Sequence, residues 1–283
     1  MQELRGLPAA KAILGQLEGE LERLSQKGIL PKLTIVRVGE REDDLSYEKG
    51  IYKRFEGVGA AVATKELPLS VTQEELEAVI KELNRDEYTH GILLFRPLPQ
   101  HLNEKRIEAI LDPEKDVDGM TPMNAAAVFA GDPKGFAPCT AQAVVEILEH
   151  YGIDVSGKKV TVVGRSMVVG RPLSMLLLHR NATVTICHTK TRQLQEECRK
   201  ADILIACAGV CGMITKGYMK EGQILIDVGI HMTPKGICGD VNQEDAGAMS
   251  AAALTPVPGG VGSVTTTILL KNTIRSAGVR QSS

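Results

Sequence analysis

The sequence predicts an α/β protein of two domains. Apolar strand-like segments alternate with amphipathic helix-like segments along almost the whole chain, and this pattern restarts in the second half. At 283 residues the chain is long for one compact core. With four Phe, five Tyr and no Trp, the core must be aliphatic. Alternating strands and helices favour parallel pairing with right-handed crossovers.

In the first half, each apolar run is followed by a helical pattern. The expected helices cover residues 1–21, 45–55, 72–84 and 103–111, and the expected strands cover 32–39, 60–67 and 91–95. The segment "PEKDVDGMTPMN" is loop-like, and a helix is expected to start near Met123. These elements predict one small parallel sheet with its helices.

In the second half, the alternation begins again with a helix. The expected elements are a helix at 139–152, strands at 158–164, 182–188, 201–209 and 223–230 with helices between the first three strands, and a last helix ending near 278. A Pro/Gly loop, "LTPVPGGVG", precedes that last helix, and only "RQSS" resembles a frayed tail.

Composition excludes several classes of function. A net charge of −2 and a pI near 6.3 provide no field for nucleic acid or an anionic membrane, so a small-molecule substrate is expected. No apolar run approaches the ~18 residues of a membrane span, which predicts a cytoplasmic protein. The six His form no paired metal motif, so no metal is expected. The six scattered Cys are expected as buried reduced thiols: Cys139, Cys187, Cys198, Cys207, Cys211 and Cys238.

The segment "KKVTVVGRSMVVGRPLSMLLL" has the character of a dinucleotide loop. Gly164 ends a strand, Gly170 follows six residues later, and a helix is expected to begin near Pro172. The helix N-terminus would offer free N–H groups to a pyrophosphate. Because Ser166 occupies the second glycine position and the last spacing is longer than in G-x-G-x-x-G, a plain strand-to-helix turn remains an alternative.

The end of the next strand favours NADP over NAD. NAD sites commonly place Asp or Glu there, but this strand ends "TICHTKT" without a carboxylate. Arg165, His188, Thr189 and Lys190 could instead surround a 2′-phosphate. For each side chain taken alone, a solvated surface position is the alternative.

Several long motifs occur in order: "EKDVDGMTPMN", "PCT", "VVGRSMVVGRPLSMLL", "IDVGI", "GDV" and "TPVPGGVG". Together they resemble the bifunctional methylenetetrahydrofolate dehydrogenase/methenyltetrahydrofolate cyclohydrolase family, nearly from end to end. The resemblance implies a folate-binding catalytic domain at 1–121 completed by 264–283. It also implies a Rossmann-type NADP domain at 122–263, a folate cleft between the two domains, and a homodimer.

The resemblance also assigns site residues. The family's cleft carries a Tyr and a Lys four residues apart, a Gln before "LPLP", and the second Asp of "DVDG". Tyr47 and Asp118 match, with Asp118 the implied partner of the pterin amino group, but Ile51 and Phe95 replace the Lys and the Gln. The resemblance further implies folate contacts at Pro256, Gly259 and Gly260 and a cofactor contact at Ile230. Ser263 and Val264 stand where the family usually has Pro and Met.

Neighbouring residues are not expected to replace the missing pair. On a helix, Lys49 lies about 200° and Lys53 about 240° from Tyr47, whereas Ile51 lies about 40° away. Both lysines are therefore expected on a solvated face. Arg96 follows Phe95 directly, so in an extended strand its side chain is expected on the opposite face.

These replacements predict a loss of one reaction. Cyclohydrolase chemistry must take a proton from water and deliver one to a nitrogen, which an Ile and a Phe cannot do. Hydride transfer from the methylene carbon to nicotinamide needs no proton transfer, so a dehydrogenase with little or no cyclohydrolase activity is expected. Three alternatives stay open: a bifunctional enzyme with another base, a non-catalytic folate- or nucleotide-binding homologue, and an oxidoreductase with a different substrate.

Overall fold

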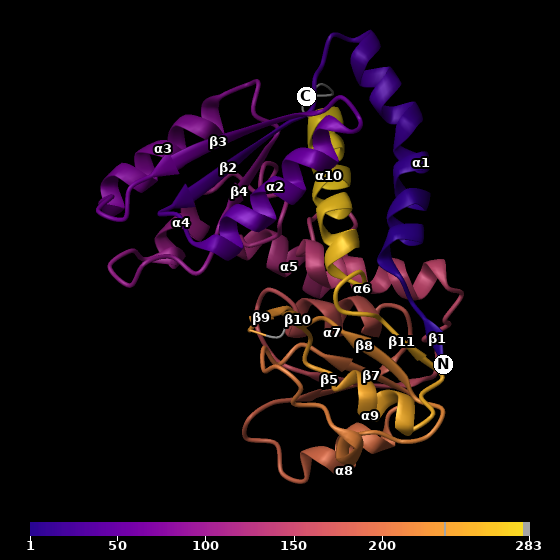
Figure 1. The fold of residues 1–283 in the computed structure, drawn as a ribbon. Coiled ribbons are helices and arrows are strands. Elements are labelled where there is room, and N and C mark those ends of the chain that lie inside the picture. The colour runs from indigo at the N-terminus through magenta and orange to yellow at the C-terminus, as the bar shows by residue number, and fades with distance from the viewer. Residues whose placement is uncertain (235, 280–283) are drawn as a thin grey trace. The chain divides into compact units, whose positions relative to one another are not determined.

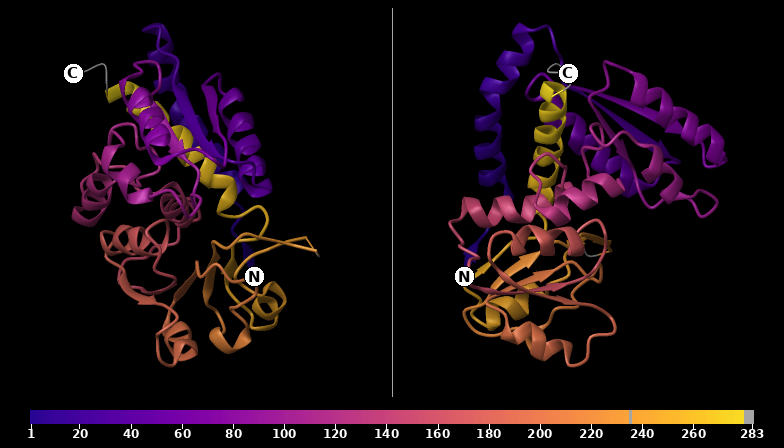
Figure 2. Two further views of the ribbon diagram at one scale, coloured as in Figure 1. Left: turned by 90° about the vertical axis from the view of Figure 1, so that its left-hand side faces the viewer. Right: turned by 180° about the vertical axis from the view of Figure 1, so that it is seen from behind.

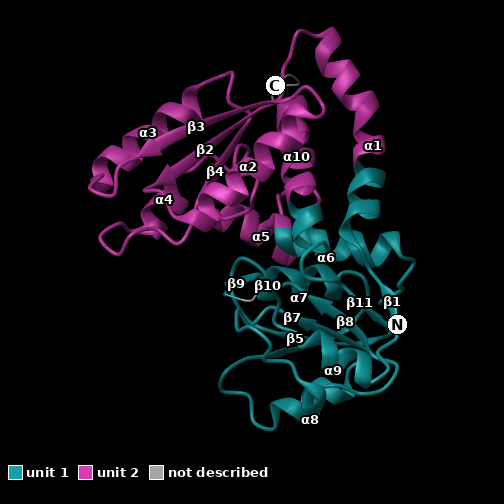
Figure 3. Ribbon diagram, viewed as in Figure 1, with its two compact units in different colours: residues 1–13, 140–265 teal, residues 14–139, 266–283 magenta. Residues whose placement is uncertain are grey.

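The computed structural model describes residues 1–234 and 236–279, so the predicted frayed tail lies outside the described residues. The chain divides into two compact units (Figure 3). Unit 1 contains residues 1–13 and 140–265, and unit 2 contains residues 14–139 and the chain from 266 onward. The predicted boundaries differ from these at both ends of the first segment. Residues 1–13 join unit 1 because Gln2 and Glu3 pair with its sheet, and residues 122–139 join unit 2.

Unit 2 is built on a three-stranded parallel sheet with the order β3-β2-β4 (Figure 1). Its strands are β2 (Lys32–Val38), β3 (Ala61–Leu67) and β4 (Gly91–Leu94), and its helices are α2 (Glu42–Glu56), α3 (Gln73–Arg85), α4 (Glu104–Ile110), α5 (Pro122–Ala130) and α10 (Gly262–Val279), with most of α1 (Gly6–Gln26). Apolar residues of β2, β4, α3 and α4 form one buried core cluster. The periodic apolar residues of the sequence therefore predicted α3 and α4 at the correct places in the chain.

Local sequence signals fix where the helices of unit 2 begin. Thr72 and Glu75 form a reciprocal capping box at the start of α3. Thr121 caps α5, whose first residue is Pro122, and Gly131 ends it in the left-handed conformation. The C-terminal helix α10 is fixed by Ser276, whose hydroxyl donates to the carbonyl of His90 at 2.6 Å.

Unit 1 contains a six-stranded sheet in which every pairing is parallel, with the order β1-β11-β8-β7-β5-β6. Its strands are β1 (Gln2–Glu3), β5 (Lys159–Val163), β6 (Thr183–Cys187), β7 (Ile203–Ala206), β8 (Ile224–Asp227) and β11 (Ala253–Leu254), and its helices are α6 (Cys139–His150), α7 (Gly170–Leu178), α8 (Leu194–Lys200), the short 3₁₀ helix η1 (Lys216–Tyr218) and α9 (Gln243–Ala248). The predicted fold class, two α/β domains with a Rossmann-type parallel sheet in the second, is confirmed.

Several short elements of unit 1 were not predicted. Residues 1–21 were expected to be one helix, but Gln2 and Glu3 form the edge strand β1 and the helix begins at Gly6. Strands β9 (His231–Thr233) and β10 (Gly236–Cys238) form an antiparallel hairpin, which projects away from the six-stranded sheet in the left panel of Figure 2. Two- and three-residue strands have too few residues to show a period, and their pairing partner decides their conformation.

Two cysteines correct the prediction of six reduced thiols. Cys211, in the loop after β7, forms a disulfide with Cys238 of β10, and their Cα atoms are 6.2 Å apart. The other four cysteines are free thiols. The pairing was not visible in the sequence because 27 residues separate the partners, and the intervening hairpin brings them together.

Among the described residues, no helix is both long and apolar enough to cross a membrane.

Candidate functional site

A cluster in unit 2 brings together the predicted residues Tyr47, Phe95 and Asp118 and two unpredicted ones, Arg96 and Cys139. Tyr47 comes from α2, Phe95 and Arg96 directly follow β4, Asp118 lies in the loop before α5, and Cys139 opens α6. The rings of Tyr47 and Phe95 have centroids 5.7 Å apart. Arg96 Nη2 lies 3.6 Å from Asp118 Oδ2, and the Cys139 N–H donates to Asp118 Oδ1 at 3.0 Å.

One side of this cluster is apolar. Ile51, one helical turn after Tyr47, is fully buried, and Phe95 is 6% exposed. The Tyr47 ring is half-buried and packs on the Phe95 ring with a 34° tilt. Positions 51 and 95 are therefore filled by hydrocarbon that neither exchanges a proton nor holds a water molecule.

The two aspartates of "DVDG" have different surroundings. Asp116 is buried and closes its own loop, because its carboxylate accepts from the N–H groups of Met120 and Thr121 at 2.9 and 2.8 Å. The Asp118 side chain remains 22% exposed. Between them and α5, Gly119 has φ 63°, and a Cβ there would collide with the Phe136 carbonyl oxygen. The segment at Gly119 thus packs closely against residues 136–138, which places Asp118 next to Cys139.

Burial, which removes side chains from water, has the largest effect on the pKa values of this cluster. Burial raises the pKa of the Asp118 carboxyl, although the Cys139 N–H and the Arg96 charge act against that rise. Burial, with the nearby Asp118 charge, also raises the pKa of the Tyr47 phenol and of the Cys139 thiol well above their ordinary values. Tyr47 and Cys139 are therefore neutral at physiological pH, and Asp118 is the group of this cluster whose protonation is most easily changed.

Arg96 corrects one prediction. Its side chain was expected to point away from this cluster because strand residues alternate in direction. Strand β4 ends at Leu94, however, so the alternation no longer applies to Arg96. The guanidinium instead reaches Asp118, and the Arg96 carbonyl accepts a hydrogen bond from Arg41 at 3.3 Å.

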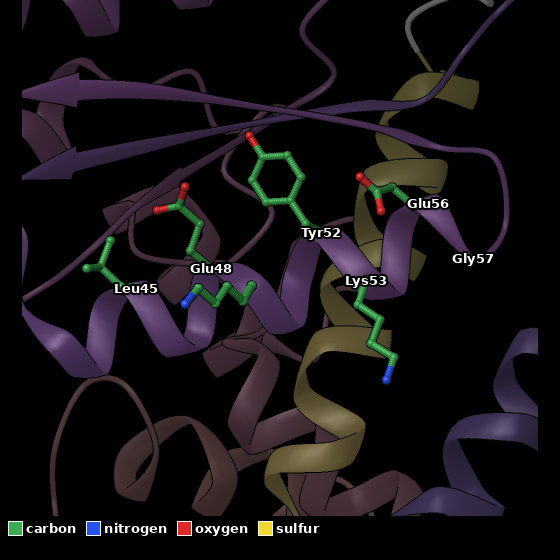
Figure 4. A pocket seen from close by; sticks show the side chains of 7 residues that line it. Leu45, Glu48, Tyr52, Lys53, Glu56 and Gly57 are labelled. Atoms are coloured by element: carbon green, nitrogen blue, oxygen red, sulfur yellow. The ribbon is translucent and has the colours of Figure 1, made fainter.

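The two lysines of α2 lie where the helical angles placed them. Lys49 and Lys53 are exposed and line a shallow hollow of about 570 Å³ along the outer face of α2 with Glu48 and Tyr52. Figure 4 shows Tyr52 and Glu48 directed toward the neighbouring strands and Lys53 pointing away from them. The Tyr52 hydroxyl hydrogen-bonds with the Thr64 hydroxyl of β3 at 3.1 Å. Ile51 is buried, so it faces a different side of the helix from the two exposed lysines.

In unit 1, the predicted dinucleotide loop is a tight strand-to-helix turn. A Cβ at Gly164, which has φ 137°, would strike the Cys207 carbonyl oxygen, and one at Gly170 would strike the Gly164 carbonyl oxygen. Ser166 Oγ accepts from the Val169 N–H at 3.1 Å, and α7 begins at Gly170, two residues before the buried Pro172. These two glycines therefore let the turn pack tightly against its own chain at the start of α7.

The residues predicted to bind a 2′-phosphate lie at the ends of two neighbouring strands. Strands β5 and β6 are parallel, and the Gly164 N–H donates to the Cys187 carbonyl at 2.9 Å. Arg165 and His188 therefore follow adjacent strand ends. Arg165, Thr189 and Lys190 are exposed and His188 is half-buried, so the groups at this edge of the sheet are cationic or neutral.

The remaining predicted residues lie in a second loop region of unit 1. The Gly259 carbonyl accepts from the Gly6 N–H at 2.8 Å, and a Cβ at Gly260 would strike the Pro256 carbonyl oxygen. Ile230 is 59% exposed, and its Cδ1 would lie 3.0 Å from a Cβ added at Gly262. Ile230 and the 256–262 loop are thus neighbours.

Two buried carboxylates, which the sequence analysis did not single out, hold this region in place. Asp227 at the end of β8 accepts from the N–H groups of Gly229, Asp240 and Val241. Asp240 accepts from three consecutive N–H groups, those of residues 208–210, and contacts His231 Nε2 at 2.7 Å. Asp227 lies in the motif "IDVGI" and Asp240 in "GDV". For Asp227, the available signal was an acid at the end of an apolar strand.

Comparison with known proteins gives the family. Residues 4–118 match the catalytic domain, and residues 138–281 the NAD(P)-binding domain, of the tetrahydrofolate dehydrogenase/cyclohydrolase family. The predicted nicotinamide cofactor and folate substrate class are in this way confirmed.

Individual relatives agree with the family match over nearly the whole chain. A protein of Clostridioides difficile named bifunctional protein FolD is 51% identical over 276 residues, which are 97% of this chain and 96% of that protein. The crystal structure of the bifunctional FolD of Campylobacter jejuni has a TM-score of 0.95 and 38% identity, with 99% of each chain covered. The Trypanosoma brucei FolD, complexed with NADP cofactor and inhibitor, has a TM-score of 0.92 and 35% identity, covering 99% of this chain and 98% of its own. The chain belongs to the tetrahydrofolate dehydrogenase/cyclohydrolase family.

Proposed function

We propose that this protein is an NADP-dependent methylenetetrahydrofolate dehydrogenase of one-carbon metabolism that has little or no cyclohydrolase activity. The observation that carries the proposal is the paired replacement at Ile51 and Phe95, both buried beside Tyr47. These two positions serve one step, the transfer of protons during hydrolysis of the methenyl bridge. The similarity to bifunctional relatives supports the dehydrogenase activity. Whether this chain also has cyclohydrolase activity is argued from its own residues.

The two half-reactions make different demands on this site. In the dehydrogenase step, a hydride leaves the methylene carbon for nicotinamide, and the remaining cation is shared by two nitrogens. Tyr47 and Phe95 offer a flat apolar wall for the folate ring system, and Asp118 an acceptor for donors of the pterin. An apolar wall also keeps water away from the cationic product. Nothing in the dehydrogenase step requires the missing lysine.

In the cofactor domain, NADP supplies the hydride acceptor when bound. Gly164, Ser166, Gly170 and Pro172 would place the pyrophosphate at the start of α7, with Ile230 as a further cofactor contact. Arg165, with His188, Thr189 and Lys190, would hold the 2′-phosphate, and this favours NADP over NAD. What supports this placement is the tight glycine turn from β5 into α7, because the N-terminus of a helix offers free N–H groups to a phosphate.

The other assignments follow the family. Pro256, Gly259 and Gly260 would contact the folate, with Ser263 and Val264 altering that loop. A homodimer and a cytoplasmic location are the expected assembly and compartment.

A cofactor titration tests the dehydrogenase. Purified protein is mixed with methylenetetrahydrofolate and either NADP or NAD, and formation of reduced cofactor is followed. We expect a higher kcat/KM with NADP. Cofactor binding without reduction would contradict the proposal and favour a non-catalytic homologue. A thermal shift produced by other carbonyl or hydroxyl substrates, but not by tetrahydrofolate, would favour a different oxidoreductase.

One observation favours the bifunctional alternative. The raised pKa of Asp118 makes it the best proton acceptor of the cluster. If Asp118 acts as the base, the wild-type protein should hydrolyse methenyltetrahydrofolate faster than buffer does, and Asp118→Asn should abolish this at saturating substrate. We expect no enzyme-dependent hydrolysis in either protein.

A further inference from the structure

We propose that Arg96 is a positioning residue for Asp118, and that its guanidinium keeps the Asp118 carboxylate ionised and oriented toward the donors of the pterin ring. This inference rests on the proposed function, in which Asp118 binds the pterin.

The geometry leaves the carboxylate available to a ligand. Asp118 Oδ1 accepts the Cys139 N–H at 3.0 Å, which fixes the rotation of the carboxyl group. Oδ2 lies 3.6 Å from Arg96 Nη2, which is too long for a hydrogen bond. Arg96 therefore supplies charge without occupying the lone pairs of Oδ2. The Asp118 carboxylate can therefore accept hydrogen bonds from two donors of a pterin while its ion pair with Arg96 persists.

Arg96 is largely buried at its side chain and is held at its backbone. Its side chain is 17% exposed, and its backbone carbonyl accepts from Arg41 Nη2. Arg41 is in turn fixed by two contacts with Asp44 at 2.9 and 2.7 Å. A guanidinium keeps its charge at any physiological pH, so it cannot take the place of the missing lysine as a base. Its contribution is a permanent positive charge beside Asp118.

A positive charge beside Asp118 has a specific task because burial and the nearby Asp116 charge oppose ionisation of the carboxyl, and the hydrogen bonds from Cys139 counteract them without a charge. Cys139 from α6 and Tyr47 from α2 stay neutral, and Asp116 of the same loop adds negative charge. Burial disfavours the carboxylate most strongly, and Arg96 is the charged side chain that counteracts it. Without Arg96, Asp118 would hold a proton to higher pH and present a hydroxyl where the pterin needs an acceptor.

The test compares Arg96→Leu, Arg96→Gln and Arg96→Lys with the wild type in the NADP-dependent dehydrogenase assay. Removing the charge should raise the KM for methylenetetrahydrofolate about tenfold, with a smaller change in kcat. In the Leu and Gln variants, KM should fall as pH rises, because Asp118 then loses its proton at a higher pH than in the wild type, whereas Lys should restore most of the wild-type KM and pH profile. Arg85→Leu, an exposed position at the end of α3, is the matched control.

The outcomes separate this inference from the proposed function. A wild type that reduces no NADP contradicts the proposed function itself. An active wild type whose Leu and Gln variants keep the same KM and pH profile overturns the role of Arg96. A lower KM in those variants would also overturn it, because Arg96 would then compete with the pterin. The Gln variant retains a polar side chain, so it guards against a Leu variant that fails to fold.

Discussion

The double substitution Ile51→Lys with Phe95→Gln is expected to create cyclohydrolase activity in this chain. Lys at position 51 would lie on the same side of α2 as Tyr47, and Gln at position 95 would replace the ring now stacked on Tyr47. The pair would supply a proton acceptor and a group that can orient water. The gain should be measurable as enzyme-proportional loss of methenyltetrahydrofolate.

The structure sets the cost of this change. Ile51 has no exposed surface, so a lysine there loses its hydration and its pKa should fall by several units, toward neutrality. Keeping such a lysine neutral at pH 7 costs about 4 to 5 kcal/mol relative to a solvated one, a large part of the ~5–15 kcal/mol that stabilises a typical domain. We therefore expect a urea midpoint well below that of the wild type, which recovers as pH rises.

The assay follows methenyltetrahydrofolate alone, across pH, with the double variant and a matched Ile51→Met, Phe95→Gln variant. The methionine control fills the same buried space but cannot accept a proton. Hydrolysis by the lysine variant should rise with pH through the lysine's depressed pKa. If the lysine variant retains dehydrogenase activity yet hydrolyses no faster than the methionine variant, the reasoning about position 51 is refuted.

Three further predictions concern unit 1. Arg165→Ala should raise the KM for NADP about tenfold and leave the KM for NAD nearly unchanged; equal effects on both cofactors would contradict a 2′-phosphate contact. Cys238→Ser, which removes the bridge to Cys211, should lower the free energy of unfolding in urea by about 3 kcal/mol. A dithiol should destabilise the wild type equally, and an unaffected wild type would contradict this. Burial raises the pKa of Asp227 to about 6, so the folded carboxyl holds its proton more tightly than the unfolded one. The stability of the wild type relative to Asp227→Asn should therefore fall as pH rises from about 4 to about 6, and a difference in urea midpoint that rises over this range would refute it.

The long periodic elements were predictable because their signals are local. The strands β2 and β5 are apolar runs, and α3 carries its capping box in the sequence itself. Helical angles alone also placed Lys49 and Lys53 on an exposed face of α2.

The features that were missed depend on distant partners. The two-residue strand β1 exists only because β11 lies beside it, and the disulfide needs the hairpin that follows β8. Arg96 reaches Asp118 because β4 ends at Leu94, one residue before the end of the apolar run. Strand alternation carries no information about where the pairing stops, so the contact could not be read from the sequence.

The most direct test of the central claim follows one reaction of the wild-type protein, methylenetetrahydrofolate with NADP, at two wavelengths that report reduced cofactor and methenyl product separately. The account predicts that both accumulate in equal amounts and that the methenyl product then decays only at its rate without enzyme. Decay of the methenyl product in proportion to enzyme concentration would contradict the account, because it would require a proton-transferring group that Ile51 and Phe95 do not supply.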